Sequence, residues 1–249
     1  MIVQARNVSK TYGSNGHLNK ALDNITMTIL EGEFVGLMGP SGAGKTSLLN
    51  IFSTIDTASS GEIKIMGKDI NAMKEAELAN FRRHELGFVF QDYHLLDTLS
   101  VKDNIVLPLA LSGVPVHEIE KRAQEIAHKL DLVDVLSQFP YQISGGQKQR
   151  AAVARAMIAK PRLVLADEPT GALDSKAATD VLERLQTLNQ TDRATILLVT
   201  HDAYAASFCQ RIIFMKDGRF DQELDRRGRS RVEFFHVILD MLATLGGNA

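Results

Sequence analysis

Cysteine, tryptophan and long hydrophobic runs are scarce or absent in this sequence of 249 residues. The single cysteine, Cys209, excludes a disulfide within the chain and favours a reducing compartment. The most apolar stretches, RLVLAD and ATILLVT, are far shorter than the roughly 20 residues that a membrane helix needs, and the N-terminus has no run of signal-peptide length. The formal net charge of -2 shows no basic excess of the kind that nucleic acid binding uses. We therefore expect a chain of cytosolic type without a nucleic-acid partner.

Hydrophobic patterning predicts an α/β core interrupted by a helical block. A helical block of about 60 residues, from about 101 to 159, separates two groups of predicted strands. The dipeptide Asp217-Gly218 predicts a hairpin within 211–220. Predicted strands are 1–12, 22–30, 32–39, 61–70, 86–92, 162–167 and 194–201, with a polar loop at 13–21; helices are predicted at 45–55, 100–113, 115–132, 145–159 and 175–190. Such an alternation indicates a mostly parallel sheet that binds ligands at the carboxyl ends of its strands.

The segment GPSGAGKTS at 39–47 matches the phosphate-binding pattern G-x-x-x-x-G-K-[ST] between a predicted strand and a predicted helix. Its glycines let backbone N–H groups surround phosphate oxygens, and the helix N-terminus adds positive potential. We expect Lys45 to reach the β- and γ-phosphates and the Thr46 hydroxyl to bind Mg²⁺. The predicted nucleotide-binding residues here are Gly39, Pro40, Ser41, Gly42, Ala43, Gly44, Lys45, Thr46 and Ser47.

Polar side chains follow three further predicted strands. Asp167 is expected to hold Mg²⁺, and Glu168 to polarise the attacking water. His201 could contact the γ-phosphate, and Gln91 could sense Mg²⁺ or the water. The alternatives are a helix-capping acidic pair at 167–168 and a structural or surface role for a lone histidine. The predicted catalytic residues are therefore Glu168, His201 and Lys45, and the predicted metal ligands are Thr46, Gln91 and Asp167.

Tyr12, just before Gly13, could stack on an adenine base, since an aromatic ring offers any base a flat apolar face. The alternative is that this N-terminal tyrosine only packs against its neighbours. The residue itself does not decide between the two.

A second glycine turn, Ser144-Gly145-Gly146-Gln147, opens a predicted helix. Ser144 is a natural N-cap residue, and the backbone amides and helix dipole again make an anion site. The turn lies in the helical block, away from the predicted strand ends. A second copy of the chain, arranged head to tail about a two-fold axis, would bring this turn onto the nucleotide of its partner. We therefore expect a homodimer that encloses two nucleotides.

The motifs GPSGAGKTS, FQD, ISGGQKQR, LVLADEPTGALDS and VTHD resemble, in order and spacing, the ATP-binding subunit of ATP-binding cassette (ABC) transporters. The resemblance covers residues 2–220. It implies a P-loop NTPase of the α/β class, with a RecA-like core, an antiparallel β subdomain and a helical subdomain at about 100–160. It also implies an ATP- and Mg²⁺-dependent ATPase, with Asp174 on a loop that communicates across the dimer.

The same resemblance implies an integral-membrane permease as partner, and a place on the cytoplasmic face of the cell membrane through that permease. The stretch after Gln91 would help form the groove that receives a coupling helix. The segments 91–109, 211–220 and 231–242 look most like the bacitracin-type peptide-antibiotic transporters of Gram-positive bacteria, which implies signalling to a sensor histidine kinase through the permease. Lipoprotein-release, macrolide-export and cell-division types share the core motifs, and a soluble non-transport ABC ATPase is the remaining alternative.

The segment 221–249 is expected to be a basic linker, DRRGRSR, followed by an amphipathic helix. Its apolar face packs either on the core of its own chain or on a partner. The residues expected on that face are Phe235, Ile238, Leu239, Leu242 and Leu245.

Overall fold

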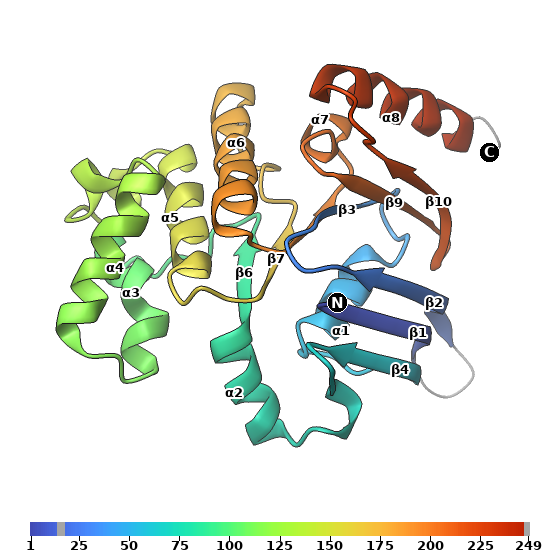
Figure 1. Ribbon diagram of the computed structural model, residues 1–249, viewed down its shortest axis with the longest axis horizontal. Helices are drawn as coiled ribbons and strands as arrows, with labels where there is room; N and C mark the ends of the chain where they lie inside the picture. Colours follow the sequence, from blue (N-terminus) through green and yellow to red (C-terminus); the bar gives the residue numbers. More distant parts are fainter. Residues whose placement is uncertain (14–17, 247–249) are drawn as a thin grey trace.

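A computed structural model describes residues 1–13 and 18–246 of the chain (Figure 1). Residues 14–17 of the expected polar loop lie outside the described residues. A six-stranded sheet of order β10-β9-β3-β8-β7-β6 forms the centre, with β10 antiparallel to β9 and the other neighbours parallel. Its strands are β3 (Phe34–Met38), β6 (Leu86–Phe90), β7 (Leu163–Asp167), β8 (Ile196–Thr200), β9 (Arg211–Lys216) and β10 (Arg219–Asp225). The expected mostly parallel sheet is confirmed.

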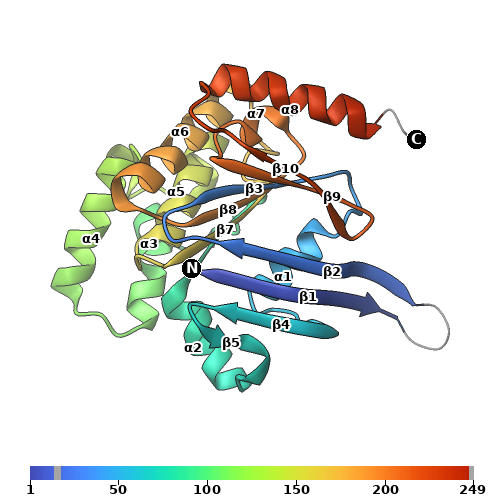
Figure 2. The same ribbon diagram turned by 45° about the vertical axis from the view of Figure 1, so that its right-hand side comes forward.

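A second, antiparallel sheet of order β2-β1-β4-β5 covers one face of the central sheet (Figure 2). It contains β1 (Val3–Tyr12), β2 (Asn19–Ile29), β4 (Ser60–Ile65) and β5 (Lys68–Asp69). The predicted strand at 61–70 is therefore two strands, because the chain turns at Met66-Gly67, where both residues have positive φ. Helix α1 (Lys45–Phe52) shares one apolar cluster with both sheets.

Helices cover the other face of the central sheet, in the left and upper parts of Figure 1. The helical subdomain forms from α3 (Val101–Leu111), α4 (Val116–Lys129) and α5 (Gly145–Met157), with the short 3-10 turns Val133–Val135 and Pro140–Gln142. Helix α6 (Ser175–Asp192) and the short α7 (Ala203–Ala206) complete the layer. Successive side chains of β3 alternate between the two layers, with Phe34 and Met38 toward the helices and Val35 and Leu37 toward α1 and the antiparallel sheet. This two-sided burial is why the central strands are continuously apolar.

Helix α2 (Glu75–Glu85), preceded by a 3-10 turn at Ile70–Ala72, is absent from the sequence-based assignment. Its sequence, EAELANFRRHE, is mostly polar, and only Leu78 and Phe81 are buried. Two apolar positions do not make a recognisable helical period. The helix is held by Glu77, which accepts a hydrogen bond from the backbone N–H of Lys74 (2.8 Å), and by the contact of its apolar pair with the core.

The C-terminal segment folds back on the chain's own core as α8 (Arg231–Gly246). Phe234 and Ile238 are fully buried, and the guanidinium of Arg231 lies 4.8 Å from the ring centroids of both Tyr204 and Phe208. The buried face is thus centred on Phe234, which the sequence-based face omitted, whereas Leu239 is 41% exposed. The side chain of Leu245 lies outside the described residues. The division expected after residue 220 falls inside β10, which pairs with β9 as far as Asp225.

The hairpin expected at Asp217-Gly218 is present, with positive φ at both residues between the paired Lys216 and Arg219. Over the described part of the chain, we find no helix that combines the length and apolarity needed to cross a membrane.

We predict that Ile238→Ala lowers the free energy of unfolding by about 2–5 kcal/mol, because it removes a fully buried side chain between α8 and the core. Leu239→Ala, one position along and largely exposed, is the matched control and should change it by less than about 0.5 kcal/mol. Urea unfolding followed by circular dichroism measures both. Equal effects of the two substitutions would show that α8 is not anchored through its Phe234–Ile238 face.

Candidate functional site

A cavity of about 1000 Å³ lies where the carboxyl ends of the central strands meet the antiparallel sheet. It collects residues from β1, the loop after β3, and the ends of β6, β7 and β8. Its lining residues are Tyr12, Asn19, Lys20, Ala21, Pro40, Ser41, Gly42, Ala43, Gly44, Lys45, Thr46, Ser47, Gln91, Asp167, Glu168, Val199, His201, Asp217 and Gly218. The sequence-predicted phosphate loop, acidic pair, histidine and glutamine therefore come together in one place.

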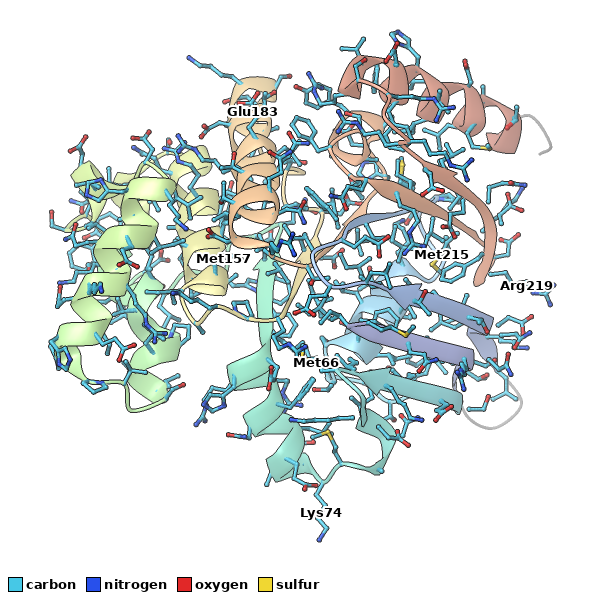
Figure 3. All side chains as sticks on the ribbon, in the orientation of Figure 1. Met66, Lys74, Met157, Glu183, Met215 and Arg219 are labelled. Atoms are coloured by element: carbon cyan, nitrogen blue, oxygen red, sulfur yellow. The ribbon has the colours of Figure 1, made fainter. Side chains whose placement is uncertain are left out.

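The phosphate loop runs from β3 into α1 with backbone that requires glycine. A Cβ at Gly39 would lie 2.2 Å from the carbonyl oxygen of Met215, which is labelled in Figure 3. Gly44 has φ +97, and a Cβ there would lie 2.4 Å from the carbonyl oxygen of Ala21. The loop thus closes tightly between β9 and β2 and leaves its backbone facing the cavity.

Lys45 is buried and curls back over this loop. Its Nζ donates hydrogen bonds to the carbonyl oxygens of Gly39 (2.7 Å) and Pro40 (3.0 Å). Burial lowers the pKa of Lys45, and the nearby carboxylates of Glu168 and Asp167 oppose that shift. The ammonium group is therefore held at the centre of the loop, where it can reach the phosphate that the loop encloses.

Glu168 is fixed by the neighbouring strand and has strained backbone, with φ 45. Its Oε2 accepts a hydrogen bond from the Thr200 hydroxyl (3.1 Å), and the Nδ1 of His201 lies 2.8 Å from its Oε1. Thr200 is fully buried, and its Oγ1 also accepts a hydrogen bond from the backbone N–H of Asp202 (3.0 Å). Both carboxylate oxygens of Glu168 are thus engaged by residues from the end of β8.

The sequence analysis did not identify Thr200 as a residue of the site. A threonine that ends an apolar strand looks like one more β-former. The only available signal was its place directly before His201.

Asp167 ends β7 in a partly buried position beside Glu168. Burial raises the pKa of Asp167, the charge of Glu168 raises it further, and Lys45 acts in the opposite direction. The ionised form of Asp167 is therefore less favourable than that of an exposed aspartate, and a bound cation would compensate its charge. A divalent ion is well suited to that task.

The donor set around Asp167 fits Mg²⁺. The Thr46 hydroxyl, the Asp167 carboxylate and the Gln91 side-chain amide line the same cavity, and all three can offer oxygen. Across residues 1–13 and 18–246 there is no group of three or more His, Cys, Asp or Glu side chains that could hold a metal by itself. Mg²⁺ commonly takes one or two carboxylates together with substrate phosphates and water, so this sparse set is adequate.

Tyr12 stands at the rim of the cavity, 38% exposed, with its hydroxyl donating to Oδ2 of Asp56 (2.7 Å). The ammonium of Lys10 lies 4.7 Å from the centroid of its ring. Sequence reasoning could not have found Lys10 and Asp56, because their contact joins residues 46 positions apart with no motif around either one.

The second glycine turn begins α5 as expected. Ser144 and Gln147 cap the helix reciprocally: the Gln147 N–H donates to the Ser144 hydroxyl (3.3 Å) and the Ser144 N–H donates to the Gln147 Oε1 (2.9 Å). Ser144 is exposed, whereas Gly146 is buried so closely that a Cβ would lie 3.0 Å from Cβ of Ala177.

The second glycine turn is not brought to the chain's own cavity. Its four residues, and Asp174 at the N-cap of α6, are not among the described residues that line it. A single chain thus assembles only part of the predicted set.

The fold and the phosphate loop define a P-loop nucleotide-binding protein of the α/β class. The family model described as ABC transporter matches residues 22–171. The sequence is 54% identical to the ABC transporter ATP-binding protein YvcR of Bacillus subtilis (strain 168), over 99% of this chain and 96% of that protein. It is 48% identical to the bacitracin export ATP-binding protein BceA of Halalkalibacterium halodurans, over 99% of this chain and 97% of that one.

Among solved structures, a dimeric post-hydrolysis state of the ATP-binding cassette MJ0796 bound to ADP and Pi is similar, with a TM-score of 0.83 at 41% identity. The match covers 91% of this chain and 100% of the other. The chain therefore belongs to the ABC transporter family, as an ATP-binding subunit with ATPase activity. The expected fold class and enzyme class are confirmed.

We predict that Asp167→Asn stabilises the nucleotide-free protein at pH 7.5. A raised folded-state pKa means that the ionised carboxyl destabilises the fold above that pKa, and the effect disappears as the pH falls through it. The gain should be about 0.5–2 kcal/mol, toward the lower end because Asp167 is partly exposed and water screens its repulsion from Glu168.

Urea unfolding at pH 7.5 and at a series of lower pH values measures the gain, which should diminish as the pH falls through the raised pKa of Asp167. Asp97→Asn, at an exposed position, is the control and should change the free energy of unfolding by less than about 0.5 kcal/mol at either pH. A destabilised Asp167→Asn protein at pH 7.5 would contradict the assigned cause of the shift.

Proposed function

We propose that the chain hydrolyses ATP as one half of a head-to-tail homodimer that drives an integral-membrane permease for peptide antibiotics. The observation that carries this proposal is the separation of two anion-binding elements within one chain. The phosphate loop and the catalytic side chains share one cavity, while the exposed turn at Ser144 faces elsewhere. A second copy is the simplest source of the missing half.

Within the cavity, we assign each residue a role from its position and chemistry. The loop amides and Lys45 bind the β- and γ-phosphates, and Tyr12 stacks on the adenine. Thr46, Gln91 and Asp167 would hold Mg²⁺, which would supply charge neutralisation for the phosphates. Glu168 accepts a hydrogen bond from the attacking water, and His201 contacts the γ-phosphate.

Each oxygen of the Glu168 carboxylate has one protein contact, to the Thr200 hydroxyl and to the His201 ring. Because each carboxylate oxygen carries two lone pairs, Glu168 can still accept a hydrogen bond from the attacking water. Thr200 and His201 would then fix the orientation of the carboxylate that receives this water.

Across the dimer, Ser144, the Gly145 and Gly146 amides and Gln147 of one subunit would contact the γ-phosphate held by the other. Asp174 begins α6 beside this turn and would lie on the path between the two sites. The dimeric state of the similar cassette MJ0796, bound to ADP and Pi, supports this arrangement.

A groove of about 400 Å³ supports docking of a permease. It lies between α2, α3, α5 and β6, and its lining is mostly apolar but includes three arginines. Arg155, one of the three, donates hydrogen bonds to the carbonyl oxygens of Tyr93 and His94, just after Gln91. An amphipathic helix with acidic residues from a membrane subunit would suit this lining, and it would place the chain on the cytoplasmic face of the membrane. The groove residues are Ala79, Arg82, Arg83, Leu86, Gly87, Phe88, Phe90, Pro108, Leu111, Arg155, Ala156 and Ala159.

The bacitracin-type assignment rests on the near full-length similarity to a bacitracin export ATP-binding protein. We propose a bacitracin-like peptide as the compound against which the complex protects. We also propose that the permease passes its state to a sensor histidine kinase.

We predict that Glu168→Gln retains ATP binding and accumulates as a dimer in ATP, because the closed sandwich forms but cannot hydrolyse its nucleotide. Size-exclusion chromatography with light scattering measures the mass. Glu168→Gln combined with Ser144→Arg is the matched control: it should bind ATP and stay monomeric, since the arginine blocks the turn that contacts the partner's nucleotide. A dimer of equal strength in the double variant would rule out Ser144 at the interface.

We predict that the tagged chain, purified from gently solubilised native membranes, carries a large permease with an extracellular domain. Mass spectrometry identifies the partners. Recovery of a sensor histidine kinase with the permease would support the signalling role, and a four-helix permease would move the protein to the lipoprotein, macrolide or cell-division type. Recovery of soluble partners alone would contradict transport while leaving the ATPase assignment in place.

A further inference from the structure

The ammonium group of the buried Lys10 lies over one face of the Tyr12 ring. Lys10 and Tyr12 are two residues apart on β1, so their side chains share one face of the strand. The Nζ of Lys10 lies 4.7 Å from the ring centroid, and Lys10 is only 8% exposed. Tyr12 lines the cavity, whereas Lys10 is not among the described residues that do. One ring face is therefore covered by Lys10, and the other is left for a ligand.

Asp56 joins the cation and the ring. Its Oδ1 accepts a hydrogen bond from the Lys10 ammonium (2.5 Å), and its Oδ2 accepts one from the Tyr12 hydroxyl (2.7 Å). Lys10 also donates to the carbonyl oxygen of Thr57 (2.7 Å). Burial raises the pKa of Asp56, but the hydrogen bonds from Lys10 and Tyr12 outweigh it and leave that pKa below its usual value. The carboxylate is thus ionised and holds both partners at neutral pH.

These contacts fix a side chain that would otherwise be mobile. An exposed tyrosine at the end of a strand normally samples several rotamers. Here the hydroxyl and one ring face are both engaged, although the residue is 38% exposed. The ring is therefore oriented before any nucleotide arrives, and a ligand that stacks on it need not immobilise it.

Asp56 also links the ring to the phosphate loop. Helix α1 begins in the loop at Lys45 and ends at Phe52, and Asp56 follows four residues later. The backbone N–H of Asp56 donates to the carbonyl oxygen of Asn50 in that helix (3.1 Å). The platform for the base and the loop for the phosphates are thus attached to opposite ends of one rigid helix.

We propose that Lys10 and Asp56 are positioning residues for the base of the nucleotide: they hold the Tyr12 ring at a fixed distance from the phosphate loop. The inference rests on the ATP site proposed above and adds two residues to it. The two residues should affect only those ligands that carry a base, because they act through the ring that stacks on it. Loss of Asp56 should weaken the binding of ATP and leave the binding of a polyphosphate without a base unchanged.

The test compares ATP with inorganic tripolyphosphate on the full chain by isothermal titration calorimetry. Asp56→Ala should raise the Kd for ATP about three- to tenfold, a fraction of the base-stacking contribution. It should leave the Kd for tripolyphosphate and the kcat at saturating ATP unchanged. Glu62→Ala is the control, because Glu62 is an ion-paired carboxylate of the antiparallel sheet that contacts Arg6 and Lys64 and does not line the cavity.

A double-mutant cycle makes the test specific to the ring. In a Tyr12→Ala background, Asp56→Ala should weaken ATP no further, because the ring that it positions is gone. Lys10→Met, which keeps the aliphatic stem, should show the same selective loss of ATP. Where Asp56→Ala does not fold, Tyr12→Phe carries the test: it keeps the ring, removes only the hydroxyl that Asp56 holds, and should weaken ATP about two- to threefold.

An unchanged Kd for ATP, or an equal loss of ATP and tripolyphosphate, would overturn the inference. Equal loss would show that Asp56 only supports the fold around α1. Failure of the wild-type chain to bind ATP, or binding by Lys45→Ala as tight as that of the wild type, would instead contradict the proposed site itself. The two failures are therefore distinguishable.

Discussion

The aligned ends of four parallel strands are the constraint on which the cavity depends. Met38 of β3 lies opposite Thr200 of β8, Asp167 of β7 opposite Val199, and Phe90 of β6 opposite Asp167. The first residues beyond these strands are therefore neighbours. A register slip of one residue would turn each terminal side chain to the other face of the sheet. Burial of the strands on both faces prevents such a slip, so the packing of the core also fixes the geometry of the site.

Unfavourable features collect at these strand ends and are compensated locally. Glu168 has a positive φ, the pKa of Asp167 is raised by burial, and the pKa of Lys45 is lowered by burial. Thr200 and His201 hold the strained Glu168, while the loop carbonyls hold Lys45. A nucleotide with a divalent cation would relieve the charge imbalance that remains. Relief of this charge imbalance would favour the binding of a ligand of that charge.

The sequence predicted those parts of the site that follow a local rule. Asp167 and His201 were recognisable because Asp167 ends one apolar strand and His201 directly follows another, and parallel strands end on one side of a sheet. Helix α2 was not predicted because only two of its side chains are buried, which is too few to form a helical hydrophobic pattern. The sequence of α8 does not show that Phe234 is buried. Apolar residues stand next to one another in this helix, so two adjacent helix faces fit the helical period equally well. The role of Asp56 was not predicted because its contacts with β1 join residues 44 to 46 positions apart and depend wholly on the fold.

The second glycine turn is connected by contacts of Tyr93 and Arg155 to the groove that we assign to the permease. A Cβ at Gly145 would lie 3.1 Å from the Tyr93 hydroxyl, and Arg155, on the helix that Ser144 caps, holds the carbonyl oxygen of Tyr93 (2.8 Å). Any displacement of the segment after Gln91 must therefore move α5 with it or break these contacts. In the proposed dimer, α5 presents Ser144 to the nucleotide of the other subunit. A membrane subunit that docks in this groove would thus act on the partner's ATP through a single helix.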